Sequence, residues 1–326
     1  MLPSYSIAIR TLGTAGEKFV RELDSIARQT IKPEKVIIYI AEGYKYPEYS
    51  IGIEQYVEVK KGMVAQRVLE YSEINSEYIL MLDDDIELAP NGVELLLNAI
   101  VENNYDCVAA DIYKSHNMSV TEKIYNIIVN FTLPLYDNKW AFKFLNNGSN
   151  TYNNNPKKNF YQSQSAAGGC SLWKKDSFLE MNYNDELWLE SLGFSYGEDL
   201  VIFNKLHKNG KKLGVLYNTN ALHLDGKSSS ASYQSNITKF YIRSIASFII
   251  WYRLCYNLKT SSFWKKTYVF FSYLLKNIWL FPIYIIASFK FRNVKVFYNY
   301  IKGIYDGIKY INSDEYKKIP NYILKK

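Results

Sequence analysis

Residues 78–85 read YILMLDDD, in which five apolar residues run directly into three acidic ones. A short apolar run with such an abrupt end is typical of a strand that is buried in a sheet. Further short apolar runs lie on both sides of it, separated by longer segments with helical spacing. The expected strands are residues 5–9, 35–40, 56–59, 78–82 and 107–110, and the expected helices are residues 17–29, 63–72 and 92–103. This alternation predicts an α/β domain with a mostly parallel sheet and helices on both faces.

The remaining chain divides into three parts. Residues 113–165 are poorly patterned and include a polar, Asn-rich run at 146–159, so we expect an insertion that forms a lid or a substrate loop. Regular patterns then predict a strand at 170–173, a helix at 198–209 and a strand at 211–217. We expect one domain over residues 1–236 and a helical region over residues 237–326. Ligands of such sheets bind beyond the carboxyl ends of the strands, so the functional residues are sought in the loops there.

The composition excludes several classes of protein. With 326 residues, 48% of them hydrophobic, the chain is long and apolar enough to bury a core. The net charge of +7 is concentrated after about residue 233, and no DNA- or RNA-binding motif accompanies it, which favours a membrane surface over nucleic acid. The three cysteines have neither metal-ligand spacing nor an even count, so we expect no disulfide framework and no zinc site. The N-terminus has no basic segment followed by an apolar one, so a cytoplasmic protein is expected.

The C-terminal region is rich in aromatic residues with Lys and Arg between them. Its apolar stretch at 268–289 is about as long as a membrane span, yet Lys276 and Asn277 lie near its middle. A charge there costs about 2.5 kcal/mol or more on insertion scales, which disfavours a spanning helix. Neighbouring aromatic and basic residues, as in WYR at 251–253 and WKK at 264–266, suit the lipid headgroup region. We therefore expect helices that lie on the inner face of the cell membrane; the alternative is a helical subdomain whose aromatic residues form a core.

The acidic triplet Asp83, Asp84 and Asp85 has no cation close to it in the sequence. Three adjacent carboxylates repel one another at neutral pH, and a divalent cation relieves this repulsion. A metal site is therefore expected. Alternation along the strand places Asp83 and Asp85 on one side and Asp84 on the other. The alternative is a solvated turn in which one Asp caps the next helix.

Residues 81–85, MLDDD, resemble the Asp-x-Asp motif of inverting glycosyltransferases with the Rossmann-like GT-A fold, and of family 2 in particular. Other segments match that family in the same order. Residues 6–10 resemble its first strand, residues 35–43 its second strand, and residues 61–67 the basic segment that precedes the metal motif. The resemblance covers about residues 4–225, whereas the C-terminal region matches nothing so specific.

The resemblance implies a nucleotide-sugar donor, with UDP as the family default. Glu42 takes the place of the acid that contacts the nucleotide base, although the preceding residue is Ala where Asp is common. Arg67 falls in the segment that contacts the nucleotide or its phosphates, and its planar fork suits that role, although an Arg in a helical pattern is often only a solvated side chain. Arg10, Asp83 and Asp84 complete the implied donor site.

Departure of a nucleoside diphosphate places negative charge on the leaving group, which Mg²⁺ or Mn²⁺ stabilises as a Lewis acid. The expected ligands are Asp85 first and Asp83 second. His223 matches a late His of the family that contacts the metal or the diphosphate. A lone His near a strand end is also often structural.

The acceptor hydroxyl loses a proton as it attacks, so a carboxylate must lie within hydrogen-bond reach of it. Residues 197–199, GED, resemble the acidic pair of the family that carries the base. Asp199 is the expected base, and Glu198 is expected to orient Asp199 or the acceptor. Two acids at a helix N-terminus also occur for purely electrostatic reasons.

The acceptor is expected beside a loop of small residues. Gly168 and Gly169 resemble this loop of the family and allow close approach of the backbone to a sugar, and Trp173 offers a ring for stacking. One base and one metal predict a single displacement with inversion. By analogy with the family, we expect a hexosyltransferase that acts on a glycan or a lipid-linked acceptor in surface polysaccharide biosynthesis.

Three other functions use similar sequence features. A sugar-nucleotide pyrophosphorylase needs a Gly-rich, basic phosphate loop after the first strand, and residues 10–16 carry only two glycines and one Arg. A non-catalytic protein that binds a nucleotide sugar and a membrane is possible if the acids hold a structural cation. A phosphatase with an Asp-x-Asp nucleophile favours the first strand and a following Thr, and the sequence has neither.

Overall fold

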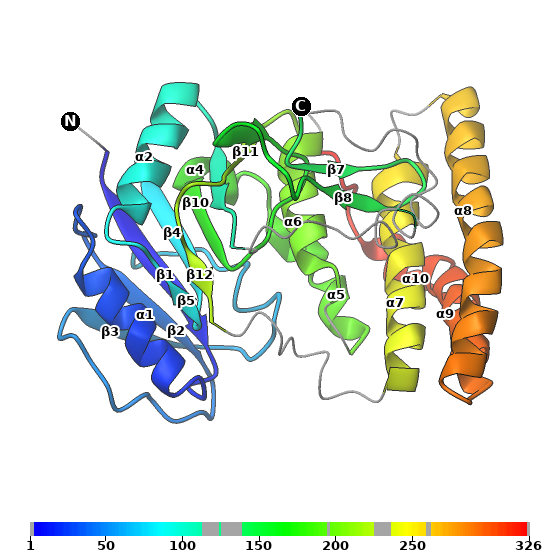
Figure 1. The fold of residues 1–326 in the computed structure, drawn as a ribbon, viewed down its shortest axis with the longest axis horizontal. Coiled ribbons are helices and arrows are strands. Elements are labelled where there is room, and N and C mark those ends of the chain that lie inside the picture. Colours follow the sequence, from blue (N-terminus) through cyan, green and yellow to red (C-terminus); the bar gives the residue numbers. More distant parts are fainter. Residues whose placement is uncertain are drawn as a thin grey trace.

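The computed structural model describes residues 3–112, 124, 139–193, 196–224, 236–258 and 262–324. Its centre is an eight-stranded sheet with the order β3-β2-β1-β4-β10-β6-β11-β9 (Figure 1). The strands of this sheet are β1 (Tyr5–Thr11), β2 (Val36–Ala41), β3 (Glu54–Val59), β4 (Tyr78–Asp83), β6 (Cys107–Ala110), β9 (Phe160–Gln162), β10 (Cys170–Lys174) and β11 (Leu213–Leu216). β10 is antiparallel to both neighbours and β9 is antiparallel to β11, whereas the other strands are parallel. The prediction of a mostly parallel sheet is confirmed.

Different helices cover the two faces of the sheet, because successive side chains of a strand point to opposite faces. On one face, residues such as Ile9 pack against α1 (Glu17–Ala27) and α2 (Gly92–Asn103). On the other face, residues such as Met81 pack against α6 (Glu198–Lys208). Helices therefore lie on both faces, as the sequence predicts.

The helix expected over residues 63–72 is wrong. Only two overlapping turns form there: the amide of Gln66 donates to the carbonyl of Gly62 at 2.9 Å, and the amide of Val68 donates to that of Val64 at 3.0 Å. The chain then bends, and Tyr71 takes a left-handed conformation with φ 50°. Val64, Val68 and Tyr71 are buried in the core, which gives a helix-like pattern without a helix.

Several chain segments meet at the carboxyl edge of the parallel strands. β10 runs antiparallel, so the loop that precedes it lies beside the end of β4, where the amide of Asp83 donates to the carbonyl of Gly169 at 3.0 Å. A separate ladder of β5 (Ile86–Glu87) and β12 (Leu222–His223) returns the residues after β11 to the same edge. The fold thus places predicted site residues of three segments, 83–85, 168–169 and His223, on one edge.

The expected insertion, residues 113–165, is only partly within the described residues, since 113–123 and 125–138 lie outside them. Its second half is structured, and its role as a lid or substrate loop stays a prediction. It forms the hairpin of β7 (Phe142–Phe144) and β8 (Asn150–Tyr152) and supplies β9 as an edge strand of the main sheet. The Asn-rich run folds because its polar groups are paired; for example, the Asn147 side chain accepts from the amide of Ser149 at 3.0 Å.

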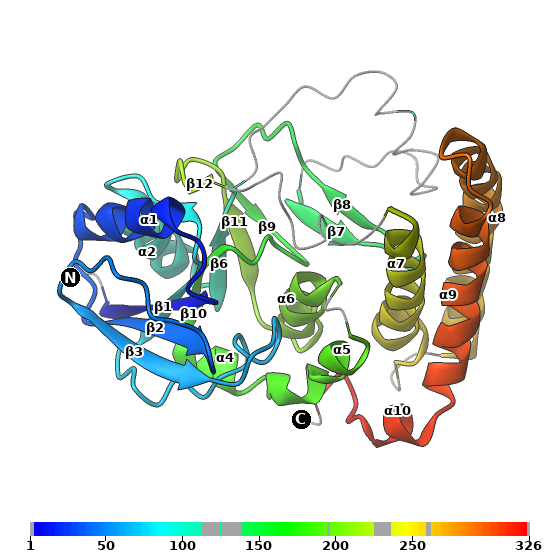
Figure 2. The same ribbon diagram turned by 90° about the horizontal axis from the view of Figure 1, so that it is seen from below.

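The short elements between β10 and α6 are α4 (Lys175–Leu179), the 3-10 turn η1 (Tyr183–Glu186) and α5 (Trp188–Ser191). The C-terminal region consists of α7 (Asn236–Trp251), a π-helical turn η3 (Tyr252–Tyr256), α8 (Phe263–Lys290), α9 (Lys295–Ile311) and α10 (Asp314–Lys318). In both views α7 lies between α6 and the antiparallel pair α8 and α9 (Figures 1 and 2). Residues of α7 such as Ile249 belong to the same apolar cluster as Phe203 of α6, so the helical region shares its core with the sheet domain.

A buried ionic group also joins the helical region to the sheet domain. The carboxylate of Glu186 accepts from Arg253 Nε at 2.9 Å and Nη2 at 2.7 Å, and Lys205 Nζ lies 3.1 Å from it. Burial alone would raise the pKa of Glu186, but these two cations hold it below its usual value. Arg253 also donates to the carbonyl of Pro320 at 3.0 Å, which fixes the end of the chain against the same group.

Candidate active site

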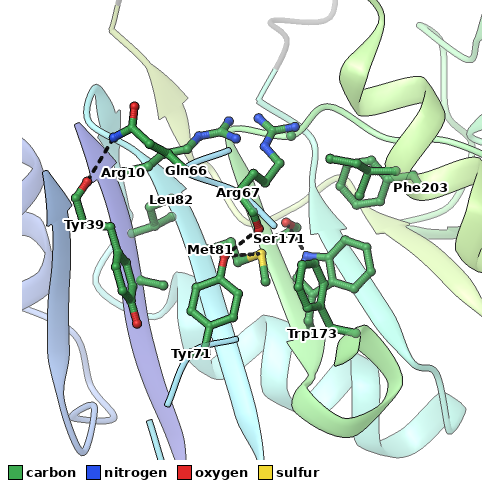
Figure 3. Close-up of a pocket in the computed structure, with 14 residues that line it drawn as sticks. Arg10, Tyr39, Gln66, Arg67, Tyr71, Met81, Leu82, Ser171, Trp173 and Phe203 are labelled. Carbon is green, nitrogen blue, oxygen red and sulfur yellow. Dashed lines mark hydrogen bonds between the residues drawn. The ribbon is translucent and has the colours of Figure 1, made fainter. Parts of the chain in front are cut away.

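Two arginines hold Asp83, the first acid of the triplet. Arg10, the last residue but one of β1, lies directly beside Asp83 in the parallel register, and its Nε donates to Asp83 Oδ1 at 2.5 Å. Nη2 of Arg67 lies 3.8 Å from the same oxygen. Figure 3 shows the two guanidinium groups at the same level above Met81. No cation is close to the triplet in the sequence, but the fold supplies two, so Asp83 does not depend on a metal for charge compensation.

Asp84 lies on the opposite side, as strand alternation predicts. It accepts a hydrogen bond from the Thr11 hydroxyl at 2.5 Å, and this hydroxyl accepts from the amide of Gly13 at 2.7 Å. Burial raises the pKa of Asp84 to about 6. Glu22 lies nearby and is completely buried. Its carboxylate has no hydrogen-bond partner among the described residues. Burial, followed by the charge of Asp84, raises the pKa of Glu22 well above its usual value. Asp84 therefore organises the loop after β1.

Asp85 pairs with His223. The pairing of β12 with β5 sets His223 next to Ile86, and Nε2 of His223 lies 3.1 Å from Asp85 Oδ2. A carboxylate and an imidazole are suitable ligands for Mn²⁺, and carboxylates also suit Mg²⁺. Within the described part of the chain, no group of three or more His, Cys, Asp or Glu side chains is arranged to hold a metal ion. Asp85 and His223 therefore suit an ion that takes its remaining ligands from substrate phosphates and water, as Mg²⁺ usually does.

Asp199 lies in the first turn of α6 and is held by two donors. Arg67 Nη1 donates to one oxygen, and the amide of Gly168 donates to the other at 3.0 Å. A Cβ at position 168 would collide with the Asp199 carboxylate, so only Gly allows this approach. Gly169 is also confined, since a Cβ there would lie 2.9 Å from the side chain of Ile112. The glycine loop thus positions the acid.

Glu198 precedes Asp199 at the start of α6. Burial raises its pKa to about 7, the amide at the helix N-terminus and Arg10 oppose the rise, and Asp83 and Glu190 add to it. A carboxyl group with a pKa near 7 can carry or release a proton at neutral pH. Two acids with different environments therefore lie side by side at the edge of the sheet.

Glu42 and Trp173 are both predicted to contact a ligand. Glu42 is exposed directly after β2, and its contact with a nucleotide base stays a prediction. The stacking role expected for Trp173 is wrong, because its side chain is only 1% exposed. It pairs in register with Cys107, at the opposite end of the strands, and its ring stacks on Phe203 with centroids 5.1 Å apart.

A small cavity of about 20 Å³ lies beneath Arg10 and Arg67 (Figure 3). It is too small for a sugar. Side chains around it anchor the segment that carries Arg67. Gln66 Nε2 donates to the carbonyls of Thr11 at 3.0 Å and Tyr39 at 3.2 Å, and the Tyr71 hydroxyl donates to the carbonyl of Arg67 at 2.9 Å.

Glu190, which no sequence pattern marks as a site residue, holds the same segment from the other side. Its Oε1 accepts from the amides of Val64 at 2.5 Å and Ala65 at 3.2 Å. A Cβ at Gly62 would lie 2.7 Å from the same oxygen, so Gly is needed there. Because Glu190 is 126 residues away from Val64 in the chain, only the fold reveals this contact.

The chain resembles known proteins in sequence and in fold. Residues 20–178 match the model of glycosyl transferase family 2. No curated protein matches the chain. A crystal structure of GalNAc-T7 with UDP, GalNAc and Mn²⁺ is similar with a TM-score of 0.50 at 13% identity; the similarity covers 90% of this chain and 59% of that one. A crystal structure of S. aureus TarS 1-349 in complex with UDP-GlcNAc is similar with a TM-score of 0.52 at 11% identity; the similarity covers 94% of this chain and 81% of that one. At these identities the likeness establishes the fold only.

Proposed function

Since this chain belongs to glycosyl transferase family 2 and has the GT-A fold, we propose that it transfers a sugar from a nucleotide-sugar donor to a hydroxyl group of a glycan or a lipid-linked acceptor. One observation carries the proposal: Arg67 contacts both Asp83 at the end of β4 and Asp199 on α6. The donor acids and the acid that serves as base thus meet at the edge where ligands of such sheets bind.

The donor that the site fits best is a UDP-sugar. Arg10 and Arg67 supply planar cationic forks for the diphosphate, and Asp83 holds both of them in place. Exposed Glu42, at the end of β2, reaches the nucleotide base. The similar structures of GalNAc-T7 and TarS contain UDP and UDP-GlcNAc respectively, which supports this nucleotide.

Asp85 and His223 are the residues that would hold Mg²⁺ or Mn²⁺, with Asp83 nearby as a further acid. The metal, when bound, supplies Lewis-acid stabilisation of the charge on the leaving diphosphate. GalNAc-T7, a protein with a similar fold, was crystallised with Mn²⁺. The 3.1 Å contact between His223 and Asp85 sets both side chains in one place before any ligand binds.

Asp199 accepts the proton of the acceptor hydroxyl as that oxygen attacks the sugar. The amide of Gly168 and the guanidinium of Arg67 fix its carboxylate, and Glu198 orients the acceptor beside it. Gly168 and Gly169 leave room for the acceptor to approach the backbone. One base and one metal fit a single displacement, which inverts the anomeric centre.

The acceptor is proposed to be lipid-linked and to be used at the inner face of the cell membrane in assembly of a surface polysaccharide. The support is α8, which is long and apolar enough to associate with a membrane and whose side chains are largely exposed. The alternative is a non-catalytic protein that binds a nucleotide sugar and a membrane. Such a protein makes the same contacts but does not transfer the sugar.

A thermal-shift panel of nucleotide sugars, each with Mn²⁺ and with chelator, tests the proposal. We expect a UDP-sugar to raise the melting temperature only with Mn²⁺, and the best binder to release UDP when Mn²⁺ is present. Product analysis by NMR should then show an anomeric configuration opposite to that of the donor. Binding without any release of UDP, even with acceptor extracts from membranes, would favour the non-catalytic alternative.

A further inference from the structure

The outward face of α8 is almost entirely apolar. Large side chains along its whole length are exposed, including Trp264 (78%), Ile278 (57%) and Phe289 (77%). The other large exposed apolar residues of α8 are Phe263, Tyr268, Phe270, Phe271, Leu274, Leu275, Trp279, Phe281 and Ile286. Soluble monomers rarely expose so large a continuous apolar surface, so this face is a contact surface.

The polar residues that interrupt the sequence of α8 point inward. Nζ of Lys276 lies 3.3 Å from the carbonyl of Asn147 in the hairpin of β7 and β8, and the side chain is buried. Asn277 accepts a hydrogen bond from the Tyr300 hydroxyl of α9 at 2.5 Å. The polar residues that argue against a spanning helix are therefore satisfied by the protein, and they leave the outward face free of charge.

α8 cannot cross a bilayer without taking its neighbours with it. Its inner face packs on α9, which carries the exposed residues Lys302 and Lys309 and the acid Asp306. Asp306 accepts from the Tyr241 hydroxyl of α7 at 3.1 Å, and α7 shares the core of the sheet domain. Insertion across the membrane would bury these charges in lipid, which is costly. An orientation parallel to the membrane plane keeps every one of these contacts.

The charge around this face has one sign. The sequence has no Asp or Glu from residue 226 to residue 305. Lys265 and Lys266 lie at one end of α8, and Lys290 and Arg292 lie at the other. Basic residues at both ends of an apolar face complement anionic headgroups, whereas they would repel the same face of a second copy of the chain.

We propose that α8 lies in the plane of an anionic lipid membrane, with its face from Trp264 to Phe289 in the interface, and that it does not span the bilayer. Figures 1 and 2 both place α8 at the end of the molecule opposite β1 to β3. Strand β1, which carries Arg10, and strand β2, which ends just before Glu42, then lie at the end of the molecule away from lipid. This inference deepens the proposed membrane location and does not depend on the reaction.

Depth measurement with spin labels tests the orientation. Phe263→Cys, Ile278→Cys and Phe289→Cys place one nitroxide at each end of α8 and one at its middle, and the three native cysteines are buried. In vesicles that contain phosphatidylglycerol, we expect all three labels at about the same depth, roughly 5–10 Å into the headgroup and acyl boundary. A spanning helix would place the Ile278 label about 15 Å deeper than both ends. That result, or no binding of the unlabelled protein to these vesicles, would overturn the proposal.

A double substitution to Glu on α8 tests the face itself, and a double substitution elsewhere is the matched control. Phe271→Glu together with Ile278→Glu changes two residues of the α8 face, and Ile53→Glu together with Val101→Glu makes the same change at exposed apolar residues away from the helical region. We expect the α8 pair to weaken vesicle binding about 100-fold and the control pair to leave it unchanged. Equal binding of both pairs would refute the assignment of the face. Sedimentation showing a dimer without lipid, lost in the α8 pair, would identify a second copy as the occupant and also refute it. Vesicle binding without sugar transfer would contradict the proposed reaction alone.

Discussion

The guanidinium of Arg67 donates a hydrogen bond to the carboxylate of Asp199, across 132 residues of sequence. The same guanidinium lies 3.8 Å from Asp83. Arg67 therefore links the acids at the end of β4 to the first turn of α6, and the geometry of the proposed base depends on it.

Arg67→Lys should lower kcat about 100-fold, because a point charge cannot replace the planar fork that orients two carboxylates. Arg21→Lys is the matched control, since Arg21 is exposed and forms its ion pair with Glu87 away from Asp199. Steady-state kinetics of both variants, with the donor identified by thermal shift, would check this. A wild-type kcat for Arg67→Lys would contradict the linking role.

Asp85→Ala and Asp199→Asn should separate donor binding from transfer. Asp85→Ala removes a metal ligand, so Mn²⁺ should no longer strengthen donor binding. Asp199→Asn keeps the donor site and removes the base, so donor affinity should stay within about twofold while kcat falls about 1,000-fold. Calorimetric titration of UDP with and without Mn²⁺ and a rate assay measure the two effects. Equal Mn²⁺-dependent affinity in wild type and Asp85→Ala would refute the metal assignment.

The sequence predicts which segments form the proposed site but not which residues pair within it. Strand alternation correctly separates Asp83 from Asp84, because the period of a strand is local information. The contact of Arg10 with Asp83 depends on β1 lying next to β4, although β2 and β3 come between them in the chain. Strand order is set by packing of the whole sheet, and the sequence alone does not state it.

The positions of Trp173 and Lys276 also depend on the tertiary structure. Trp173 follows the glycine loop closely in sequence, but β10 runs antiparallel and carries this residue to the far end of the sheet, into the core. Lys276 interrupts an apolar stretch, and only the tertiary structure shows that it turns toward Asn147. Closeness in sequence to the glycine loop therefore predicts the wrong position for Trp173. The composition of the apolar stretch does not show where Lys276 points.

Glu190→Ala should impair the enzyme through Arg67. The substitution leaves the amides of Val64 and Ala65 without their acceptor, which should cost about 1–3 kcal/mol of stability and also lower kcat by loosening the segment that holds Arg67. Glu190→Gln retains a carbonyl oxygen and should recover most of both losses. Glu180→Ala, at an exposed acid paired with Lys211, serves as the control. Unchanged kcat in a destabilised Glu190→Ala would show that the role is structural only.

Stability should depend on pH through Glu198. Its pKa is about 7 in the folded protein and about 4.5 when unfolded, so between these values the folded state binds more protons and stability falls as pH rises. Glu198→Gln cannot ionise, so relative to wild type it should gain up to about 3 kcal/mol between pH 4.5 and pH 7.5. Chemical denaturation at both pH values with chelator present would measure the gain. Glu102→Gln, at an exposed position of α2, should show no such gain.

The helical region is expected to be essential for folding, because its charges complete a buried group in the sheet domain. Arg253→Met leaves Glu186 buried with Lys205 as its remaining cationic partner, and should cost about 3–5 kcal/mol of stability. The double variant Arg253→Met with Glu186→Gln removes both charges and should recover part of that loss. Removal of residues 237–326 should therefore yield misfolded protein, so its failure to bind membranes would say nothing about α8. Denaturation of the two variants decides the point: equal stability of Arg253→Met and wild type would show that the ionic group does not hold the helical region to the sheet.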